Sequence, residues 1–143
     1  MLRQRTLIWL TLAVVVVFAA ASVSAQEKTV VSIAFWGGID DLEVNQALKE
    51  AFEAENPDIE VELLHLPDEY GDKINTMIAS GPAPDVIMQA EGFSSYAAAG
   101  TILPLDSFIA SDPDFPVSDY FPLVVDAYRF DGNLYVLPSR WSP

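Results

Sequence analysis

Residues 68–89, DEYGDKINTMIASGPAPDVIMQ, contain the pattern of a complete helix, turn and strand. Asp68 stands where an N-cap residue would begin the helix. Apolar side chains then recur at helical spacing, at Ile74, Met77 and Ile78. Ser80-Gly81 ends the helix, and the two prolines that follow prevent it from resuming. The apolar run 86–88 is too short for a helix and suits a strand covered on both faces, which indicates a parallel sheet with helices on either side.

The segment before this stretch contributes another strand and helix. Residues 29–36, TVVSIAFW, carry no charge and are rich in β-branched and aromatic residues, which predicts a central strand that ends at Gly37-Gly38. Asp40 or Asp41 can then cap a helix. The helix carries one apolar stripe two turns long, formed by Val44, Ala47, Leu48, Ala51 and Phe52.

A second strand follows Asn56-Pro57, which stops the helix. Ile59, Val61 and Leu63 alternate with acidic residues, a pattern typical of a strand near the sheet edge. The order is therefore strand, helix, strand, helix, strand. This order predicts right-handed βαβ units and an α/β fold with a parallel sheet, in which ligands bind beyond the carboxyl ends of the strands.

The remainder of the chain has shorter predicted elements. Helices are expected over 94–99, near 105–110 and over 119–128, and a strand is expected over 134–137. Gly100 closes the first helix, and Asp119 can cap the third. Prolines and aspartates in 101–116 indicate connecting structure, and Asp131-Gly132 is a turn signal before the last strand.

The first 25 residues have the organisation of a secretory signal peptide. Arg3 and Arg5 precede an apolar run over 7–21, and Val23-Ser24-Ala25 offers small residues to a signal peptidase. The alternative is a transmembrane anchor, but the run is shorter than the ~20 apolar residues that span a bilayer. We expect cleavage after Ala25 and a mature protein in the periplasm or outside the cell.

The mature part is acidic and lacks cysteine. Without the two arginines of the signal, five basic residues stand against 21 acidic ones, a net charge of −16. Such a chain is repelled by phosphate backbones and anionic lipid, which excludes nucleic-acid binding. Because no cysteine is present, disulfides cannot support the fold and no lipoprotein anchor is expected.

Catalysis and metal binding have little support. His65 is the only histidine, and we interpret it as structural because one imidazole without cysteine makes a poor metal set. No serine lies in a nucleophile elbow, and Gly37-Gly38 lacks the third glycine of the dinucleotide pattern. Asp112-Pro113-Asp114 lacks the downstream glutamate of a calcium loop. We therefore expect no catalytic residue, metal or cofactor.

Residues suited to sugar recognition stand at the predicted strand ends. Aromatic faces stack on the apolar face of a pyranose ring, while carboxylates, amides and arginine bind its hydroxyls. The candidate ligand-binding residues are Trp36, Asp40, Gln89, Glu91, Arg140 and Trp141. Core packing would explain Trp36 equally well. Tyr70 fits a helix surface as readily as a ligand contact.

Five motifs, spread over nearly the whole mature chain, resemble the extracellular solute-binding proteins of ABC importers, in the group that includes maltose-binding and related sugar-binding proteins. The motifs are FWGG at 35–38, AFEAENPDIEVE at 51–62, YGDKINTMIASGPAPDVIMQ at 70–89, YAAAGTILPLD at 96–106 and FDGNLYVLP at 130–138. The resemblance implies a two-lobed, doubly wound α/β protein that closes on a solute and delivers it to a membrane permease. It implies no catalytic role for the six candidate residues.

The resemblance covers only the first lobe of such a protein. We expect residues 26–110 to form the α/β core of that lobe and residues 111–143 to lead to the inter-lobe hinge, with the second lobe missing. The expected partners are a sugar and the permease subunits, and the expected state is a monomer. Because a later return of the chain completes this lobe in the family, we expect residues 26–143 alone to be marginally stable.

Two other functions remain open from the residues alone. One is a secreted glycoside hydrolase, for which Asp40 and Glu91 are the only credible acid and base. The other is a scaffold domain that binds no ligand.

Overall fold

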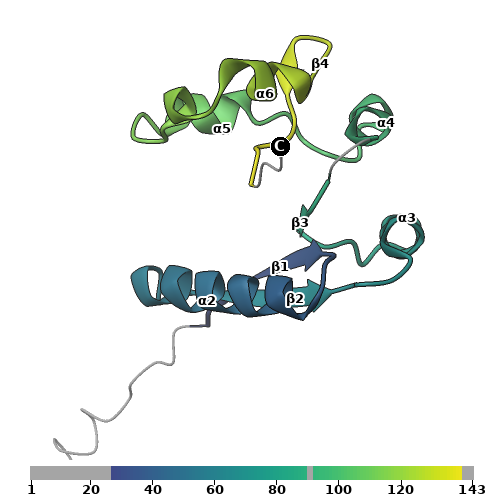
Figure 1. Cartoon of the computed structure of the whole chain (residues 1–143), viewed down its shortest axis with the longest axis vertical. Helices are drawn as coiled ribbons and strands as arrows, with labels where there is room; N and C mark the ends of the chain where they lie inside the picture. Colours follow the sequence, from purple (N-terminus) through teal and green to yellow (C-terminus); the bar gives the residue numbers. More distant parts are fainter. Residues whose placement is uncertain (1–26, 90–91, 140–143) are drawn as a thin grey trace, which may run out of the picture.

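The main sheet has three parallel strands in the order β2-β1-β3 (Figure 1). The computed structural model describes residues 27–89 and 92–139, so the predicted signal peptide lies outside the described residues. Strand β1 spans Thr29–Phe35, β2 spans Ile59–His65 and β3 spans Val86–Ile87. The prediction of a parallel sheet with the first strand at its centre and the second at its edge is confirmed.

Helix α2, Ile39–Glu55, begins two residues earlier than a cap at Asp40 would allow. Gly38 is the N-cap, so the prediction of Asp40 or Asp41 in that role is wrong. The Asp41 carboxylate instead accepts a hydrogen bond from the Gly38 N–H at 2.8 Å. An acidic side chain in the first helical turn can satisfy the N-cap nitrogen in this way.

The polar side of α2 covers the open edge of β2. Glu53 accepts a hydrogen bond from the Val61 N–H at 2.7 Å, and Lys49 donates to the Val61 carbonyl at 2.5 Å. Lys49 and Glu53 also form an ion pair at 2.6 Å, and this pair holds the pKa of Glu53 below its usual value. The two side chains thus satisfy backbone groups that an edge strand would otherwise leave unpaired.

Helix α3, Tyr70–Ser80, leads into β3. Its N-cap is Glu69, in the left-handed region at φ 51°, rather than the predicted Asp68, and Gly81 caps its other end as expected. Just before β3, Asp85 accepts hydrogen bonds from the Ser32 N–H at 2.8 Å and the Ser32 hydroxyl at 2.7 Å. These bonds link β3 to the middle of β1 one residue before ladder pairing starts.

The second half of the chain forms a separate layer of short elements (Figure 1). They are α4 (Phe93–Ala99), α5 (Asp106–Ser111), a 3₁₀ turn (Val117–Asp119), α6 (Pro122–Ala127), and the hairpin of β4 (Arg129–Phe130) and β5 (Asn133–Leu134). Gly100 caps α4 as predicted. Asp119 lies in the 3₁₀ turn and Phe121 caps α6, so the helix predicted from Asp119 is wrong at its start. Pro122 decides the start because proline suits the first helical position.

Asp106 holds this layer together. Its carboxylate accepts hydrogen bonds from the Leu134 N–H at 2.7 Å and from Arg129 at 3.1 Å. These bonds keep the pKa of Asp106 below its usual value, and the bond from the Leu134 N–H contributes more than the bond from Arg129. The hairpin turns at Asp131 and Gly132, both at positive φ, which confirms the predicted turn. The predicted strand is shorter than expected, since β5 ends at Leu134.

The core of the described residues is small and leaves apolar surface uncovered. Eight hydrophobic residues are buried, namely Ala34, Phe35, Val61, Ile74, Phe93, Ala97, Val125 and Leu134. On the predicted apolar stripe of α2, Leu48 is 62% exposed and Phe52 is 45% exposed. Val86 of β3 is 48% exposed, so the expectation of a strand covered on both faces is wrong within the described residues.

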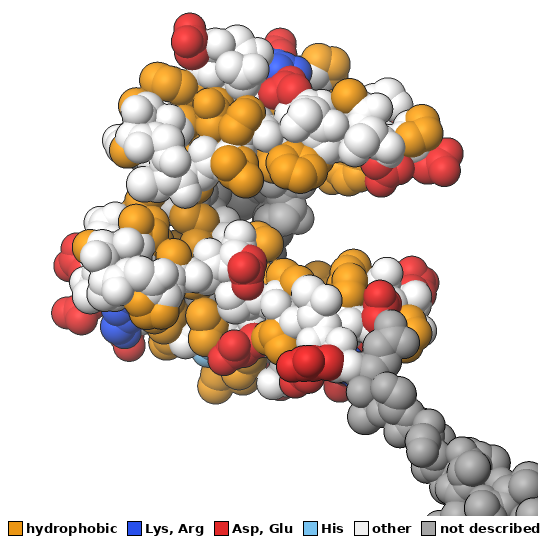
Figure 2. Space-filling view, turned by 180° about the vertical axis from the view of Figure 1, so that it is seen from behind, with side chains coloured by type: hydrophobic (Ala, Val, Ile, Leu, Met, Phe, Trp, Pro, Cys, Tyr) orange, Lys and Arg blue, Asp and Glu red, His pale blue; other side chains and the backbone are white. Residues whose placement is uncertain are grey.

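Figure 2 shows where this apolar surface gathers. A deep notch separates the part that holds α5 and α6 from the part that holds α2, and hydrophobic side chains border it on both sides. Phe108 of α5 is 58% exposed, although a large apolar side chain is usually buried in a core.

Within the described residues, no helix has both the length and the apolar character to cross a membrane.

Candidate functional site

A groove of about 710 Å³ lies at the carboxyl ends of β1 and β3, where α3 and α4 flank the sheet (Figure 1). The side chains that shape it are Trp36, Tyr70, Asn75, Gln89, Tyr96 and Thr101. Trp36 follows β1, Gln89 follows β3, Tyr70 and Asn75 come from α3, and Tyr96 comes from α4. This is the edge of a parallel sheet where ligands are expected.

Trp36 forms an aromatic wall of the groove. Its ring is half-buried and contacts the Tyr70 ring edge to face, with centroids 4.9 Å apart and planes at 66°. The backbone just after Trp36 is held by His65, whose Nε2 lies 2.9 Å from the Gly37 carbonyl oxygen. A carbonyl oxygen only accepts, so Nε2 carries the proton.

His65 therefore has a packing role, as predicted. Its ring stacks on Phe35 with centroids 5.1 Å apart. Among the described residues, no cluster of histidine, cysteine and carboxylate side chains could hold a metal ion. The contacts of His65 instead stabilise the turn that presents Trp36 to the groove.

Tyr70 joins the two strands that lead into the groove. Its hydroxyl lies 3.0 Å from the Ala34 carbonyl oxygen and 2.9 Å from the Met88 carbonyl oxygen, and its single proton is shared between them. Burial raises the pKa of Tyr70 to about 12. The phenol is therefore a neutral donor at neutral pH.

Asn75 and Tyr96 form a polar pair across the groove. The Tyr96 hydroxyl donates to Oδ1 of Asn75 at 2.7 Å, which leaves the Asn75 amide hydrogens available. Thr101 donates to the Tyr96 carbonyl at 3.0 Å and so fixes the end of α4. The pair places hydrogen-bonding groups in the same groove as the Trp36 ring.

The chemistry of the groove is neutral and aromatic. The described residues that line it include no aspartate, glutamate, histidine, lysine or arginine. Aromatic rings, amides and hydroxyls suit a neutral ligand that has both an apolar face and many hydroxyls, whereas a charged ligand would lack a counter-ion here. They supply neither a nucleophile with its base nor a paired acid and base.

The structure brings together two of the six residues predicted from the sequence, Trp36 and Gln89. Asp40 lies exposed in the first turn of α2 and does not line the groove. Glu91, Arg140 and Trp141 lie outside the described residues. Their roles therefore stay predictions.

Sequence reasoning missed Asn75 and Tyr96 and left Tyr70 undecided. Tyr70 and Asn75 both belong to α3 but are not part of its apolar pattern, so that pattern did not identify them. The signal that could have identified Tyr70 and Asn75 is their hydrogen-bonding side chains, on a helix that leads directly into β3 and its ligand-facing end.

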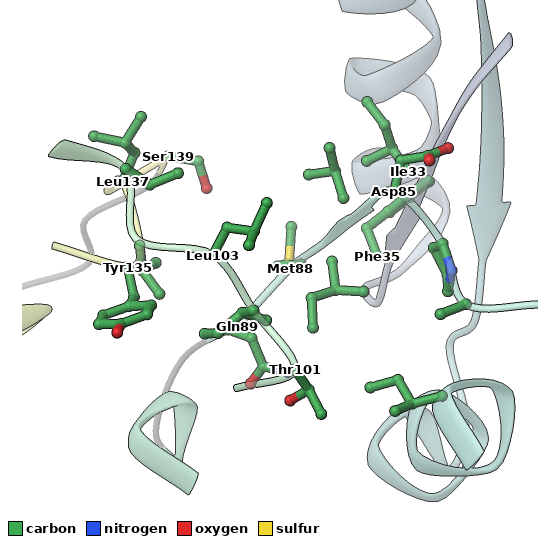
Figure 3. Close-up of a pocket in the computed structure, with 18 of the residues that line it drawn as sticks. Ile33, Phe35, Asp85, Met88, Gln89, Thr101, Leu103, Tyr135, Leu137 and Ser139 are labelled. Atoms are coloured by element: carbon green, nitrogen blue, oxygen red, sulfur yellow. The ribbon is translucent and has the colours of Figure 1, made fainter. Parts of the chain in front are cut away.

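A second cavity, of about 620 Å³, lies beside β3 and is largely apolar. Figure 3 shows Tyr135 and Leu137 on one side and Ile33 and Phe35 on the other. The β3 edge away from β1 faces no strand among the described residues. We assign this cavity to incompletely packed core, because apolar side chains make up most of its lining and it lies beside the uncovered edge of β3.

Comparison with known proteins places the chain in a family. Residues 47–143, more than half of the chain, match the family of bacterial extracellular solute-binding proteins. A maltotriose-binding protein of Pyrococcus abyssi is 29% identical over 100 residues, which cover 69% of this chain and 21% of the relative.

Solved structures agree with this match. The ABC substrate-binding protein Lmo0181 of Listeria monocytogenes, in complex with cycloalternan, is 32% identical, with a TM-score of 0.69 over 76% of this chain and 28% of the relative. The sugar-binding protein MalE of Xanthomonas citri is 30% identical, with a TM-score of 0.70 over 77% of this chain and 28% of the relative. This chain thus spans between a fifth and a third of the length of these relatives.

Proposed function

Because the chain belongs to the family of bacterial extracellular solute-binding proteins, we propose that it forms part of a carbohydrate receptor that serves an ABC importer. The observation that carries the proposal is the groove itself, where the Trp36 ring lies among the neutral polar side chains of Asn75, Gln89 and Tyr96. A pyranose presents an apolar face for the ring and hydroxyls for the amides. Two of the relatives, the maltotriose-binding protein and the sugar-binding protein MalE, are named for sugars, which supports the same class of ligand.

The proposed role is binding followed by delivery. In this role residues 26–110 form the α/β core of the first lobe, and residues 111–143 lead to the hinge. A second lobe, from a longer polypeptide, would supply the opposite wall, and closure of the two lobes would present the sugar to the permease. Export through the signal at residues 1–25 would place a monomeric receptor in the periplasm or outside the cell.

The matching relatives are solute-binding proteins rather than enzymes. The groove is consistent with that class, because Asp40 does not line it and no other acid among the described residues does. A glycoside hydrolase would need two carboxylates on either side of the sugar.

The test is a sugar titration followed by the fluorescence of Trp36. The sequence has three tryptophans, Trp9 within the signal, Trp36 and Trp141. Because Trp141 is itself a candidate ligand contact, the unsubstituted chain is titrated first, and the Trp141→Phe chain then assigns the quenching to Trp36. We expect saturable quenching by maltotriose or cycloalternan, with a dissociation constant of about 1 mM, because one lobe supplies only part of the contacts. Mannitol and phosphate serve as controls that lack the ring or carry charge.

Chromatography of the sugar after incubation separates binding from hydrolysis. Intact sugar together with quenching supports the receptor, and released product would refute it. If no sugar, peptide or anion changes the fluorescence or the thermal stability, the proposal fails in favour of a domain without a ligand.

A further inference from the structure

Tyr70 lies where the ladder between β1 and β3 ends. The two strands pair at Ile33↔Val86 and Ala34↔Ile87, and the last backbone bond runs from the Met88 N–H to the Ala34 carbonyl at 2.9 Å. Beyond these residues the strands separate, and the space between them opens into the groove. The Tyr70 hydroxyl bonds the Ala34 and Met88 carbonyls at this point.

The two carbonyls lie next to the residues that face the groove. Ala34 stands two residues before Trp36, and Met88 stands one residue before Gln89. A donor shared between them therefore sets the separation of the segments that carry both side chains. Ala34 keeps its bond from Met88 if the hydroxyl is lost, whereas no other described hydrogen bond reaches the Met88 carbonyl.

The ring of Tyr70 acts on the same wall. It meets the Trp36 ring edge to face, an arrangement that favours one orientation of the indole. The Tyr70 hydroxyl thus holds the backbone at the ends of β1 and β3, and the Tyr70 ring holds the side chain of Trp36. Both contacts are made between residues of the described chain itself.

We propose that Tyr70 is a positioning residue of the groove, which fixes the spacing of the β1 and β3 ends through its hydroxyl and the orientation of Trp36 through its ring. The inference rests on the proposed function for its link to sugar, but its structural half does not. Since its proton is engaged by two carbonyls, Tyr70 has no hydrogen to donate to a sugar, and it acts through Trp36 and Gln89 rather than by contact.

The test compares Tyr70→Phe, which removes only the hydroxyl, with Tyr70→Leu, which removes the ring as well. Acrylamide quenching is read in the Trp141→Phe chain so that Trp36 is the only reporter, and sugar affinity is measured by calorimetry in the chain that keeps Trp141. Tyr120→Phe is the matched control, because Tyr120 stacks on Phe115 away from the groove and no hydrogen bond of its hydroxyl is found among the described residues. Far-UV circular dichroism identifies the temperatures at which each variant is folded.

Without sugar, we expect Tyr70→Leu to raise the acrylamide quenching of Trp36 about twofold, while Tyr70→Phe leaves it close to the parent because the ring stays. With sugar, we expect Tyr70→Phe to weaken binding about tenfold, since loss of the shared donor frees the strand ends. Tyr120→Phe should match the parent in both measurements.

The two halves fail separately. Unchanged acrylamide quenching in Tyr70→Leu would overturn the positioning of Trp36 whether or not a sugar binds. Unchanged sugar affinity in Tyr70→Phe, measured well below its melting temperature, would overturn the role of the hydroxyl. If the parent binds no sugar, the proposed function is refuted, and the ligand-free measurement still decides the role of the ring.

Discussion

Two adjacent glycines that follow Trp36 should respond very differently to the same added methyl group. Gly37 has a φ of 130°, and a Cβ placed on it would lie 2.5 Å from Cγ of Asp41 and closer still to Oδ2. Gly38 has a φ of −82°, and a Cβ placed there meets no atom within 4 Å. Gly37→Ala and Gly38→Ala are therefore matched substitutions.

The magnitude of the Gly37→Ala effect follows from two losses. An alanine held at this φ carries backbone strain of about 1–3 kcal/mol. The methyl group also displaces the Asp41 carboxylate from the Gly38 N–H, a bond worth about 0.5–1.5 kcal/mol. We expect the free energy of unfolding to fall by about 2–4 kcal/mol. Gly38→Ala should change it by less than about 0.5 kcal/mol, because its backbone is already extended.

Urea titrations followed by far-UV circular dichroism measure this difference. Sucrose in the buffer keeps both variants folded at the start, since excluded osmolytes strengthen burial. Equal losses in the two glycine variants would show that this turn is not held as described.

Two further predictions concern stability. Residues 26–143 alone should unfold gradually on heating, because side chains such as Phe108 and Leu48 stay uncovered, and a sharp transition at high temperature by circular dichroism would contradict this. Ser32 bonds hold the pKa of Asp85 below its usual 3.8, so the stabilisation is complete above that value and is lost as the pH falls through the lower pKa of the folded state. Asp85→Asn should lower stability at neutral pH and flatten this acid dependence in urea titrations, and an unchanged acid limb would assign it to other carboxylates.

Much of the α/β half was predictable because its signals are local. Glycine and proline punctuate the chain between helix and strand patterns, so the elements and their parallel arrangement follow from neighbouring residues. Capping was less accurate, since Gly38 and Glu69 took roles expected of nearby aspartates. A cap depends on backbone conformation as well as residue type, and the sequence gives only the residue type.

The surface of α2 shows a different limit. Its apolar stripe is easy to read, yet the described structure turns Lys49 and Glu53 toward β2 and leaves Leu48 and Phe52 exposed. The hydrophobic pattern identifies a face that needs a partner. Which surface supplies that partner depends on contacts that no periodicity contains.

Residues 68–89 were enough to establish a helix, a turn and a strand of a parallel sheet, and the strand ends were enough to place Trp36 and Gln89 at one edge, because parallel strands share their carboxyl ends. The part played by Tyr70 required the folded chain. Its hydroxyl bonds carbonyls 36 residues before it and 18 residues after it. A side chain that bridges such distant segments leaves no local pattern, since the contact exists only once β1 and β3 lie side by side.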